Sequence, residues 1–169
     1  YDIGLLFSII GTPFYEARGW TPISIPTFDL TLDTNAAIPL TDSYELNIEQ
    51  ELESVRRLHA EASSEYTSVE IRDRAYWSTG PAQYRSVFPS VGVRKGSTLT
   101  GYVNWDVVDD TLWIVECCAD DPGSYKALSD LVRTAARERG IKRVLGSLPA
   151  SNPFVEALGA SAQGATEWS

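Results

Sequence analysis

The sequence is poor in the residues and runs that mark several large classes of protein. It has no methionine, not even at position 1, and an apolar run lies close to its first residue, which together indicate a fragment whose natural beginning is missing. No stretch is long and apolar enough to cross a bilayer, and no signal peptide is visible. These absences exclude a helical membrane protein and favour a soluble globular one.

Histidine and cysteine are also scarce, which limits metal and redox chemistry. The two cysteines, Cys117 and Cys118, are adjacent, and neighbours on a strand point to opposite faces, so a disulfide between them would be strained. These thiols and the single histidine, His59, are too few for a metal site. We therefore expect no metal and two buried, reduced thiols in a cytoplasmic protein. A lone helical histidine is more often a packing or surface residue than a catalytic one.

Basic residues are outnumbered, with 14 Lys and Arg against 23 Asp and Glu and a net charge of −9. Nucleic acids and anionic membrane surfaces both require a basic face, so neither is expected as a partner. An acidic protein attracts a cationic acceptor such as an amine, although many acidic proteins are simply soluble. The length of 169 residues suits one good core, or one domain and part of another.

The most informative stretch that the sequence does contain is Gly4–Trp20. Residues Leu5–Ile10 form a nearly continuous apolar run, as in a strand covered on both faces. Thr12 suits an N-cap, Pro13 the first helical position and Gly19 the position after a helix end. The stretch therefore predicts a strand, a tight turn and a short helix.

A second stretch near the other end, Asn152–Ala160, repeats this pattern after another strand-like run, Arg143–Leu148. Aligning Pro13 with Pro153 brings four more identical pairs into register without a gap. These pairs are Phe14 with Phe154, Glu16 with Glu156, Ala17 with Ala157 and Gly19 with Gly159. We interpret the match as an internal repeat. The alternative is that Pro-Phe-x-Glu-Ala is an ordinary helix start used twice.

The segment between the repeats predicts a mixed fold. Thr21–Leu32 is typical of two short strands, and the polar segment Asp33–Ser43 of a linker at a domain boundary. Asn47 is expected to cap an amphipathic helix that starts directly after it. Two further helices are expected, one over Val69–Trp77 and a long one that is opened by the loop Ala119–Tyr125 and ended by Gly140. Further strands are expected over Ser90–Arg94, Thr98–Val108 and Thr111–Cys118, and a last one within Ser161–Trp168. This order indicates an α+β or mixed α/β domain with a β-meander followed by a crossover helix.

This element order, with a short Pro-started helix that carries Tyr15 and ends in Gly19-Trp20, resembles the GNAT superfamily of acyl-CoA-dependent N-acyltransferases. The whole chain resembles the C-terminal portion of a tandem GNAT protein. Residues 1–42 would then be the C-terminal remnant of a first GNAT domain, and residues 43–169 a second one. The implied fold is a central, mostly antiparallel sheet flanked by helices.

The resemblance implies direct acetyl transfer from acetyl-CoA to a small-molecule or peptide amine. A helix N-terminus offers N–H groups to the CoA pyrophosphate, a backbone N–H holds the oxyanion, and a tyrosine protonates the leaving thiolate. Tyr15 stands at the family's tyrosine position, and Ser8 stands where the family often has asparagine. The alternative for Tyr15 is that it only anchors its helix on the sheet. Ser8 and Phe14 are candidate cofactor contacts of the first copy.

The second copy departs from the family pattern at each chemical point. Val155 stands where the first copy has Tyr15, and valine has no proton to give. In the expected pyrophosphate loop, Asp120 and Asp121 would repel phosphate and Pro122 removes an N–H donor. This indicates a degenerate, non-catalytic GNAT domain that supports the first copy or shapes its acceptor pocket. The alternative is a variant loop that binds CoA through Gly123, Ser124 and Tyr125.

Two functions from different classes follow from the sequence. The leading one is an N-acyltransferase of which this chain is an incomplete portion, and the runner-up is a non-catalytic binding or scaffolding module with a GNAT-like fold. An unrelated α+β domain is a distant third. The exposed strand edges of residues 1–42 would need cover from the second copy, from another chain in a homo-oligomer, or from a missing N-terminal segment of the same protein.

Overall fold

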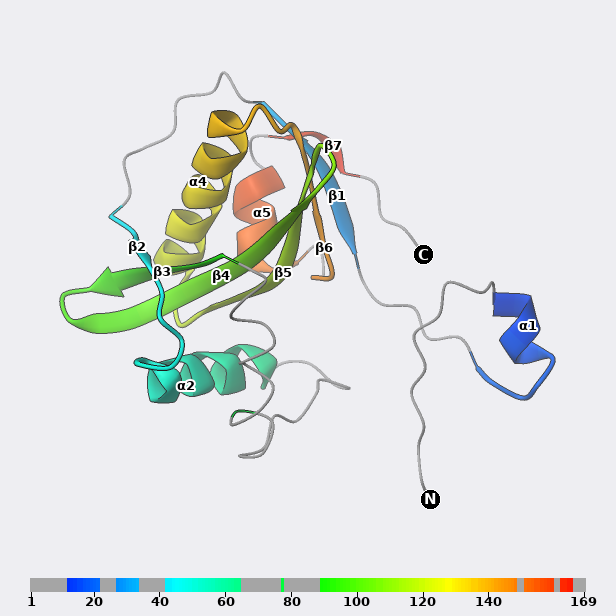
Figure 1. Cartoon of the computed structure of the whole chain (residues 1–169), viewed down its shortest axis with the longest axis horizontal. Coiled ribbons are helices and arrows are strands. Elements are labelled where there is room, and N and C mark those ends of the chain that lie inside the picture. Colours follow the sequence, from blue (N-terminus) through cyan, green and yellow to red (C-terminus); the bar gives the residue numbers. More distant parts are fainter. Residues whose placement is uncertain are drawn as a thin grey trace.

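The computed structural model describes residues 12–21, 27–33, 42–64, 77, 89–148, 151–159 and 162–165. Within these residues a seven-stranded sheet runs in the order β2-β3-β4-β5-β6-β1-β7 (Figure 1). The strands are β1 Phe28–Leu32, β2 Tyr44–Glu45, β3 Ser90–Lys95, β4 Thr98–Val108, β5 Thr111–Ala119, β6 Arg143–Gly146 and β7 Ala162–Ala165. The helices are α1 Thr12–Glu16, α2 Leu52–Ser63, α4 Pro122–Glu138 and α5 Pro153–Gly159. The predicted mixed fold, a mostly antiparallel sheet flanked by helices, is confirmed.

The β-meander forms where the sequence alternates. Strands β3, β4 and β5 pair antiparallel, with Val91 opposite Val103 and Val103 opposite Cys117. The first turn places Gly96 at a φ of 61°, which glycine adopts without steric cost, and the second places Asp109 at a φ of 53°. These three strands therefore confirm the predicted meander and its two turns.

The crossover helix α4 carries the chain from β5 to the parallel strand β6. The last described pair between β5 and β6 joins Ile114 to Gly146, and β5 continues beyond it to Ala119. The parallel pairing of β5 and β6 is what a helical crossover connection requires. It also brings the carboxyl ends of both strands to the same end of the sheet.

Strand β1 has an unexpected place. It lies between β6 and β7 and pairs antiparallel with both, with Leu30 opposite Val144 on one side and opposite Ala165 on the other. Strand β1 precedes the domain boundary predicted at residue 42, but it hydrogen-bonds to β6 and β7, which follow that boundary. The division of the chain into two copies stays a prediction, and β1 belongs to the sheet of the segment after that boundary.

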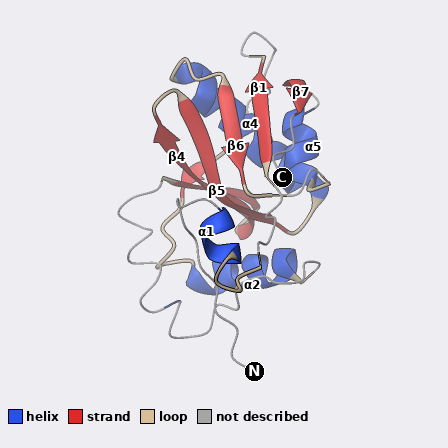
Figure 2. Ribbon diagram, turned by 90° about the vertical axis from the view of Figure 1, so that its right-hand side faces the viewer, coloured by secondary structure: helices blue, strands red, loops and turns tan. Residues whose placement is uncertain are grey.

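Two apolar cores cover the two faces of the sheet. Helices α4 and α5 pack on one face over residues that include Leu112, Ile114 and Val144, and α2 packs on the other through Val55 and Leu58. Figure 1 shows α4 and α5 on one side of the meander and α2 on the other, and Figure 2 shows the strands in front of α4 and α5. The sheet is therefore covered on one face by α4 and α5, and over part of its other face by α2.

Some local expectations hold and one is wrong. Cys117 and Cys118 are buried thiols that form no disulfide, as predicted, and burial raises the pKa of Cys117. His59 is a buried packing residue with its ring edge-to-face to Trp77 at 5.7 Å. The helix expected directly after Asn47 begins instead at Leu52, because the Asn47 side chain accepts from the N–H groups of residues 49 and 50 and closes a turn first.

Several predictions fall outside the described residues. They are the strand within Gly4–Ile10, the first of the two strands in Thr21–Leu32, most of the linker Asp33–Ser43 and all of the helix Val69–Trp77 except its last residue. Across the described ranges, none of the helices has the length and apolar character needed to cross a membrane.

Candidate functional site

A cavity opens where β5 and β6 cease to be paired. It has a volume of ≈ 370 Å³ and lies between the end of β5 and the first turns of α4 and α5, with the last turn of α2 opposite. Its lining residues are Glu61, Ala62, Ala119, Asp120, Asp121, Pro122, Tyr125, Asn152 and Pro153. The carboxyl ends of parallel strands are the usual place for ligands in sheets with crossover helices. The cavity is therefore the candidate functional site of the described residues.

The first turn of α4 forms the floor of this cavity, and its N–H groups are all engaged. Asp121 is the N-cap, and its Oδ1 accepts from Gly123 N at 2.9 Å and from Ser124 N at 3.2 Å. The Asp121 carbonyl oxygen accepts from Tyr125 N at 3.2 Å, and Pro122 has no N–H to offer. Within residues 122–125, no backbone donor remains for an external anion.

The second carboxylate oxygen of Asp121, Oδ2, is also engaged. The Ser124 hydroxyl donates to Asp121 Oδ2 at 2.6 Å and lies 2.9 Å from the Thr100 hydroxyl of β4. Lys95 at the end of β3 places its Nζ 2.9 Å from the same Oδ2. The hydrogen bond from Ser124, reinforced by Lys95, holds the pKa of Asp121 well below its usual range. Asp121 is thus an ionised cap at neutral pH.

Two further carboxylates give the cavity an acidic wall. Arg57 of α2 contacts Glu61 at 2.7 Å and Asp120 at 3.5 Å, and its other bond goes to the Leu99 carbonyl oxygen at 3.0 Å. Partial burial, together with neighbouring Asp121, raises the pKa of Asp120. Three carboxylates therefore line the cavity, and two cations, Arg57 and Lys95, pair with them. The excess of negative charge is unfavourable for binding a polyphosphate.

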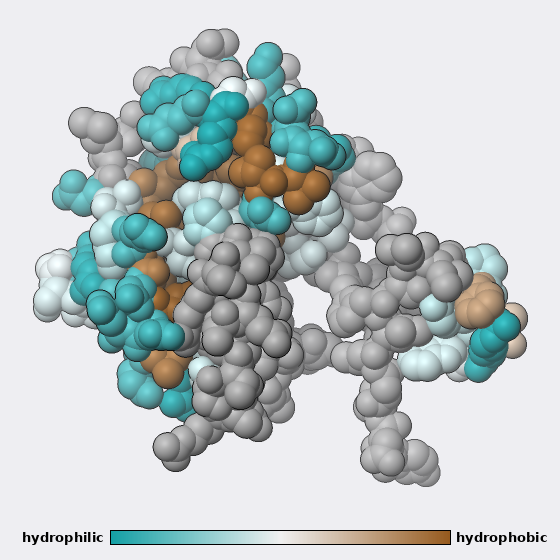
Figure 3. Space-filling view, viewed as in Figure 1, coloured by the Kyte–Doolittle hydropathy of each residue, from teal (hydrophilic) through white to brown (hydrophobic). Residues whose placement is uncertain are grey.

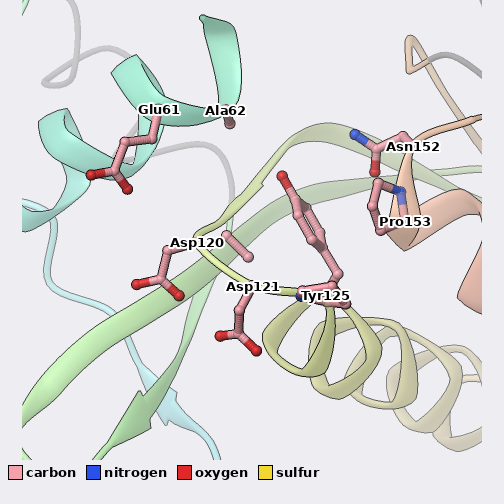
Figure 4. Close-up of a pocket in the computed structure, with 9 residues that line it drawn as sticks. Glu61, Ala62, Asp120, Asp121, Tyr125, Asn152 and Pro153 are labelled. Atoms are coloured by element: carbon pink, nitrogen blue, oxygen red, sulfur yellow. The ribbon is translucent and has the colours of Figure 1, made fainter. Parts of the chain in front are cut away.

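The opposite wall is formed by Tyr125 and by the start of α5. Asn152 is buried and caps α5, with its Oδ1 accepting from Phe154 N at 3.0 Å. Figure 4 shows the Tyr125 ring rising from α4 towards the space between α2 and Asn152. Val155, which the repeat aligns with Tyr15, is buried in the core beneath α5 and does not line the cavity. The described cavity therefore has a phenol, Tyr125, that comes from α4 and not from α5.

The structure separates the predicted site residues into two groups. Gly123, Ser124 and Tyr125 lie together on the first turn of α4, where Tyr125 lines the cavity, whereas Phe14 and Tyr15 lie on α1, which Figure 1 shows apart from the sheet. Ser8 lies outside the described residues. The roles predicted for all six residues stay predictions.

Sequence reasoning missed the residues that other elements bring to the cavity. Asn152 carries a local signal, since Asn before Pro is a recognised helix start. Glu61, Arg57 and Lys95 carry none, because only the packing of α2 and the turn after β3 bring them to α4.

Comparison of the fold with solved structures gives several matches of low sequence identity. A probable N-acyltransferase from Enterococcus faecalis V583 matches with a TM-score of 0.58 and 15% identity over 81% of this chain and 36% of that one. A GCN5-related N-acetyltransferase from Kribbella flavida matches with a TM-score of 0.57 and 12% identity, over 94% of this chain and 40% of that one. A GCN5-related N-acetyltransferase from Sphaerobacter thermophilus matches with a TM-score of 0.55 and 13% identity, over 90% of this chain and 53% of that one.

These matches show a fold shared with GNAT acetyltransferases and nothing finer. The chain spans between 36% and 53% of the length of the three structures. No protein-family model and no curated protein sequence matches the chain.

Proposed function

We propose that this chain is part of an acyl-CoA-dependent N-acyltransferase and that its described domain is a supporting, non-catalytic GNAT domain. The shared fold supports the acyltransferase part of the proposal. The first turn of α4 supports the assignment as a non-catalytic domain. The Asp121 side chain already accepts from the N–H groups of Gly123 and Ser124, which a CoA pyrophosphate would need.

The energetics of displacing this cap support the same conclusion. A pyrophosphate would have to remove an ionised carboxylate that also holds Ser124 and Lys95, and it would then face the carboxylates of Asp120 and Glu61. Charge-assisted hydrogen bonds of this kind are about twice as strong as neutral ones. The cap is therefore an internal substitute for the anion.

In this proposal acetyl transfer takes place at a second site, to which Tyr15 contributes. The neutral form of the acceptor amine attacks the thioester carbonyl of acetyl-CoA, and a backbone N–H holds the oxyanion. As the C–N bond forms, the amine nitrogen loses a proton to solvent; the C–S bond then breaks, Tyr15 donates a proton to the leaving thiolate, and solvent restores that proton to Tyr15. The acceptor is a small-molecule or peptide amine, and its positive charge suits a protein with a net charge of −9. A cytoplasmic setting belongs to the same proposal.

A second candidate is a binding or scaffolding module without catalysis, in which the ≈ 370 Å³ cavity holds a ligand other than CoA. One observation favours it: the cavity keeps a phenol, Tyr125, opposite the acidic wall.

The test is acetyl transfer from acetyl-CoA to a broad panel of amines, measured on the protein that carries this sequence. Two tyrosine variants, Tyr15→Phe and Tyr125→Phe, form a matched pair. We expect turnover to collapse in the first and to change by less than about twofold in the second. Loss of turnover in Tyr125→Phe alone places catalysis in the described cavity and contradicts the proposal. A complete absence of turnover with every amine supports the scaffold.

A further inference from the structure

The exposed large apolar side chains of the described residues gather in two places. Phe14 and Trp20, 45% and 42% exposed, belong to the α1 segment, which we define as residues 12–21. The others lie on the β4–β5 hairpin, where Trp113 is 45% exposed. Figure 3 shows hydrophobic surface over the strands of the sheet and a separate apolar area on α1. Contiguous exposed apolar surface marks a binding face more often than a solvated one.

Trp113 lies on the face of the sheet that α4 and α5 do not cover, whereas Val107, paired with the buried Leu112, lies on the other face. The register places Trp113 beside Leu145 of β6, and Leu145 beside Asp29 of β1. Residues directly paired across strands point to the same face, so these three side chains share it. We call it the open sheet face. A groove of ≈ 360 Å³ runs along it, and its lining includes Trp113, Leu145, Phe28 at the start of β1 and Thr27 just before β1.

The charges on the open sheet face cancel. Arg143 forms a two-pronged ion pair with Asp29, with Nε to Oδ1 at 3.0 Å and a terminal nitrogen to Oδ2 at 2.6 Å. Because each charge is satisfied by its neighbour, this part of the groove offers an apolar wall and a neutral rim. Such a groove suits an aromatic, weakly charged occupant better than a cation or an anion.

The α1 segment has that chemistry. The Phe14 ring lies edge-to-face to Tyr15 at 5.1 Å, and Tyr15 lies edge-to-face to Trp20 at 6.4 Å. Arg18 lies 3.7 Å over the Phe14 ring and donates to the Phe14 carbonyl oxygen at 2.7 Å. The segment is thus an ordered aromatic cluster with two exposed rings. Aromatic residues are enriched at protein–protein interfaces.

The chain connects the two surfaces directly. Thr21 ends the α1 segment and Thr27 already lines the groove, so the connection spans at most roughly 20 Å. In a single chain the segment stands off the sheet and both apolar surfaces stay exposed. A second copy would bring one segment and one face, and so would cover both surfaces of each chain.

We propose that the open sheet face binds the α1 segment of a second copy of this chain, in a reciprocal exchange around a two-fold axis. Two identical contacts close such a dimer. Phe14 and Trp20 pack against Trp113 and Leu145 of the partner.

Sedimentation equilibrium over a range of concentrations tests the dimer. Trp113→Asp places a charge on the open sheet face and is expected to weaken dimerisation at least about tenfold. Val107→Asp is the matched control, because Val107 is 39% exposed on the same hairpin and pairs with Leu112 of the opposite face. Phe14→Asp changes the α1 segment without touching the sheet and is expected to weaken the dimer equally. A monomer at every concentration, or equal weakening by Val107→Asp, overturns the proposal.

Disulfide capture tests the exchange itself. Chains carrying Phe14→Cys are mixed with chains carrying Leu145→Cys, and a covalent dimer is expected on oxidation. Val107→Cys in place of Leu145→Cys is expected to give none. A chain carrying both Phe14→Cys and Leu145→Cys distinguishes the alternative. If it closes only within itself and stays monomeric, the segment docks on its own sheet and the exchange is wrong.

Discussion

Asp121 and Ser124 are joined by two hydrogen bonds at the first turn of α4: the carboxylate of Asp121 accepts from the Ser124 backbone N–H at 3.2 Å and from its hydroxyl at 2.6 Å. This pair closes the helix end at which GNAT enzymes are expected to hold the CoA pyrophosphate.

Removing the cap should cost stability. We expect Asp121→Ala to lower the free energy of unfolding by about 1 kcal/mol, the usual loss for an N-cap, and the melting temperature by about 2–4 °C. Asp110→Ala removes a carboxylate of the exposed β4–β5 turn and should change stability by less than about 0.5 kcal/mol. Urea unfolding at neutral pH measures both. Equal losses in the two variants would mean that the cap contributes nothing of its own.

The same carboxylate should make stability depend on pH in acid. Its folded-state pKa is lowered, chiefly by Ser124, relative to an unfolded value of about 3.9. The carboxylate therefore contributes stability above that pH, and this contribution is lost as the pH falls through the folded-state pKa. We expect the stability gap between the wild type and Asp121→Asn to be full at pH 7 and to shrink below about pH 4. A stability difference between the two proteins that grows as the pH falls would contradict the lowered pKa of Asp121.

A methyl group at the last described pair of β5 and β6 should not fit. A Cβ added to Gly146 would lie 2.9 Å from the Ile114 carbonyl oxygen and 2.9 Å from Phe28 Cε1. We expect Gly146→Ala to destabilise the fold by about 1–3 kcal/mol. Gly159→Ala is the control, because nothing lies within 4 Å of its added Cβ. Thermal unfolding measures both variants, and Gly146→Ala is expected to have the lower melting temperature. Similar melting temperatures would show that β5 and β1 shift enough to accommodate the methyl group at Gly146.

Removing the proposed proton donor should lower the rate of acetyl transfer. In the protein that carries this sequence, Tyr15→Phe is expected to lower acetyl transfer about a hundredfold or more, because the thiolate then leaves unprotonated. An unchanged rate across pH would leave Tyr15 as a residue that only anchors α1.

The sequence predicts the regular elements of this fold better than their assembly. Alternation and turn residues such as Gly96 suffice for the meander, and the loop before Pro122 suffices for the start of α4. The place of β1 could not be predicted, since the alternation of Phe28, Leu30 and Leu32 fits any sheet with a free edge. The predicted start of α2 was wrong because Asn47 caps a turn five residues before Leu52, where the helix begins.

The candidate site shows the same division. The two aspartates and Pro122 already predicted a poor phosphate loop, because charge and the missing donor are local properties. That Asp121 would itself take the N–H groups, and that Lys95 and Arg57 would pair with the two aspartates, depended on the turn after β3 and on the packing of α2.

The most direct test of the account is a calorimetric titration of this chain with acetyl-CoA, beside Asp121→Ala and the Asp110→Ala control. We predict no saturable binding by the wild type below about 1 mM, and measurable binding only when the cap is removed. Micromolar binding by the wild type that Asp121→Ala leaves unchanged or weakens would contradict the central claim that the α4 N-terminus is closed to the cofactor.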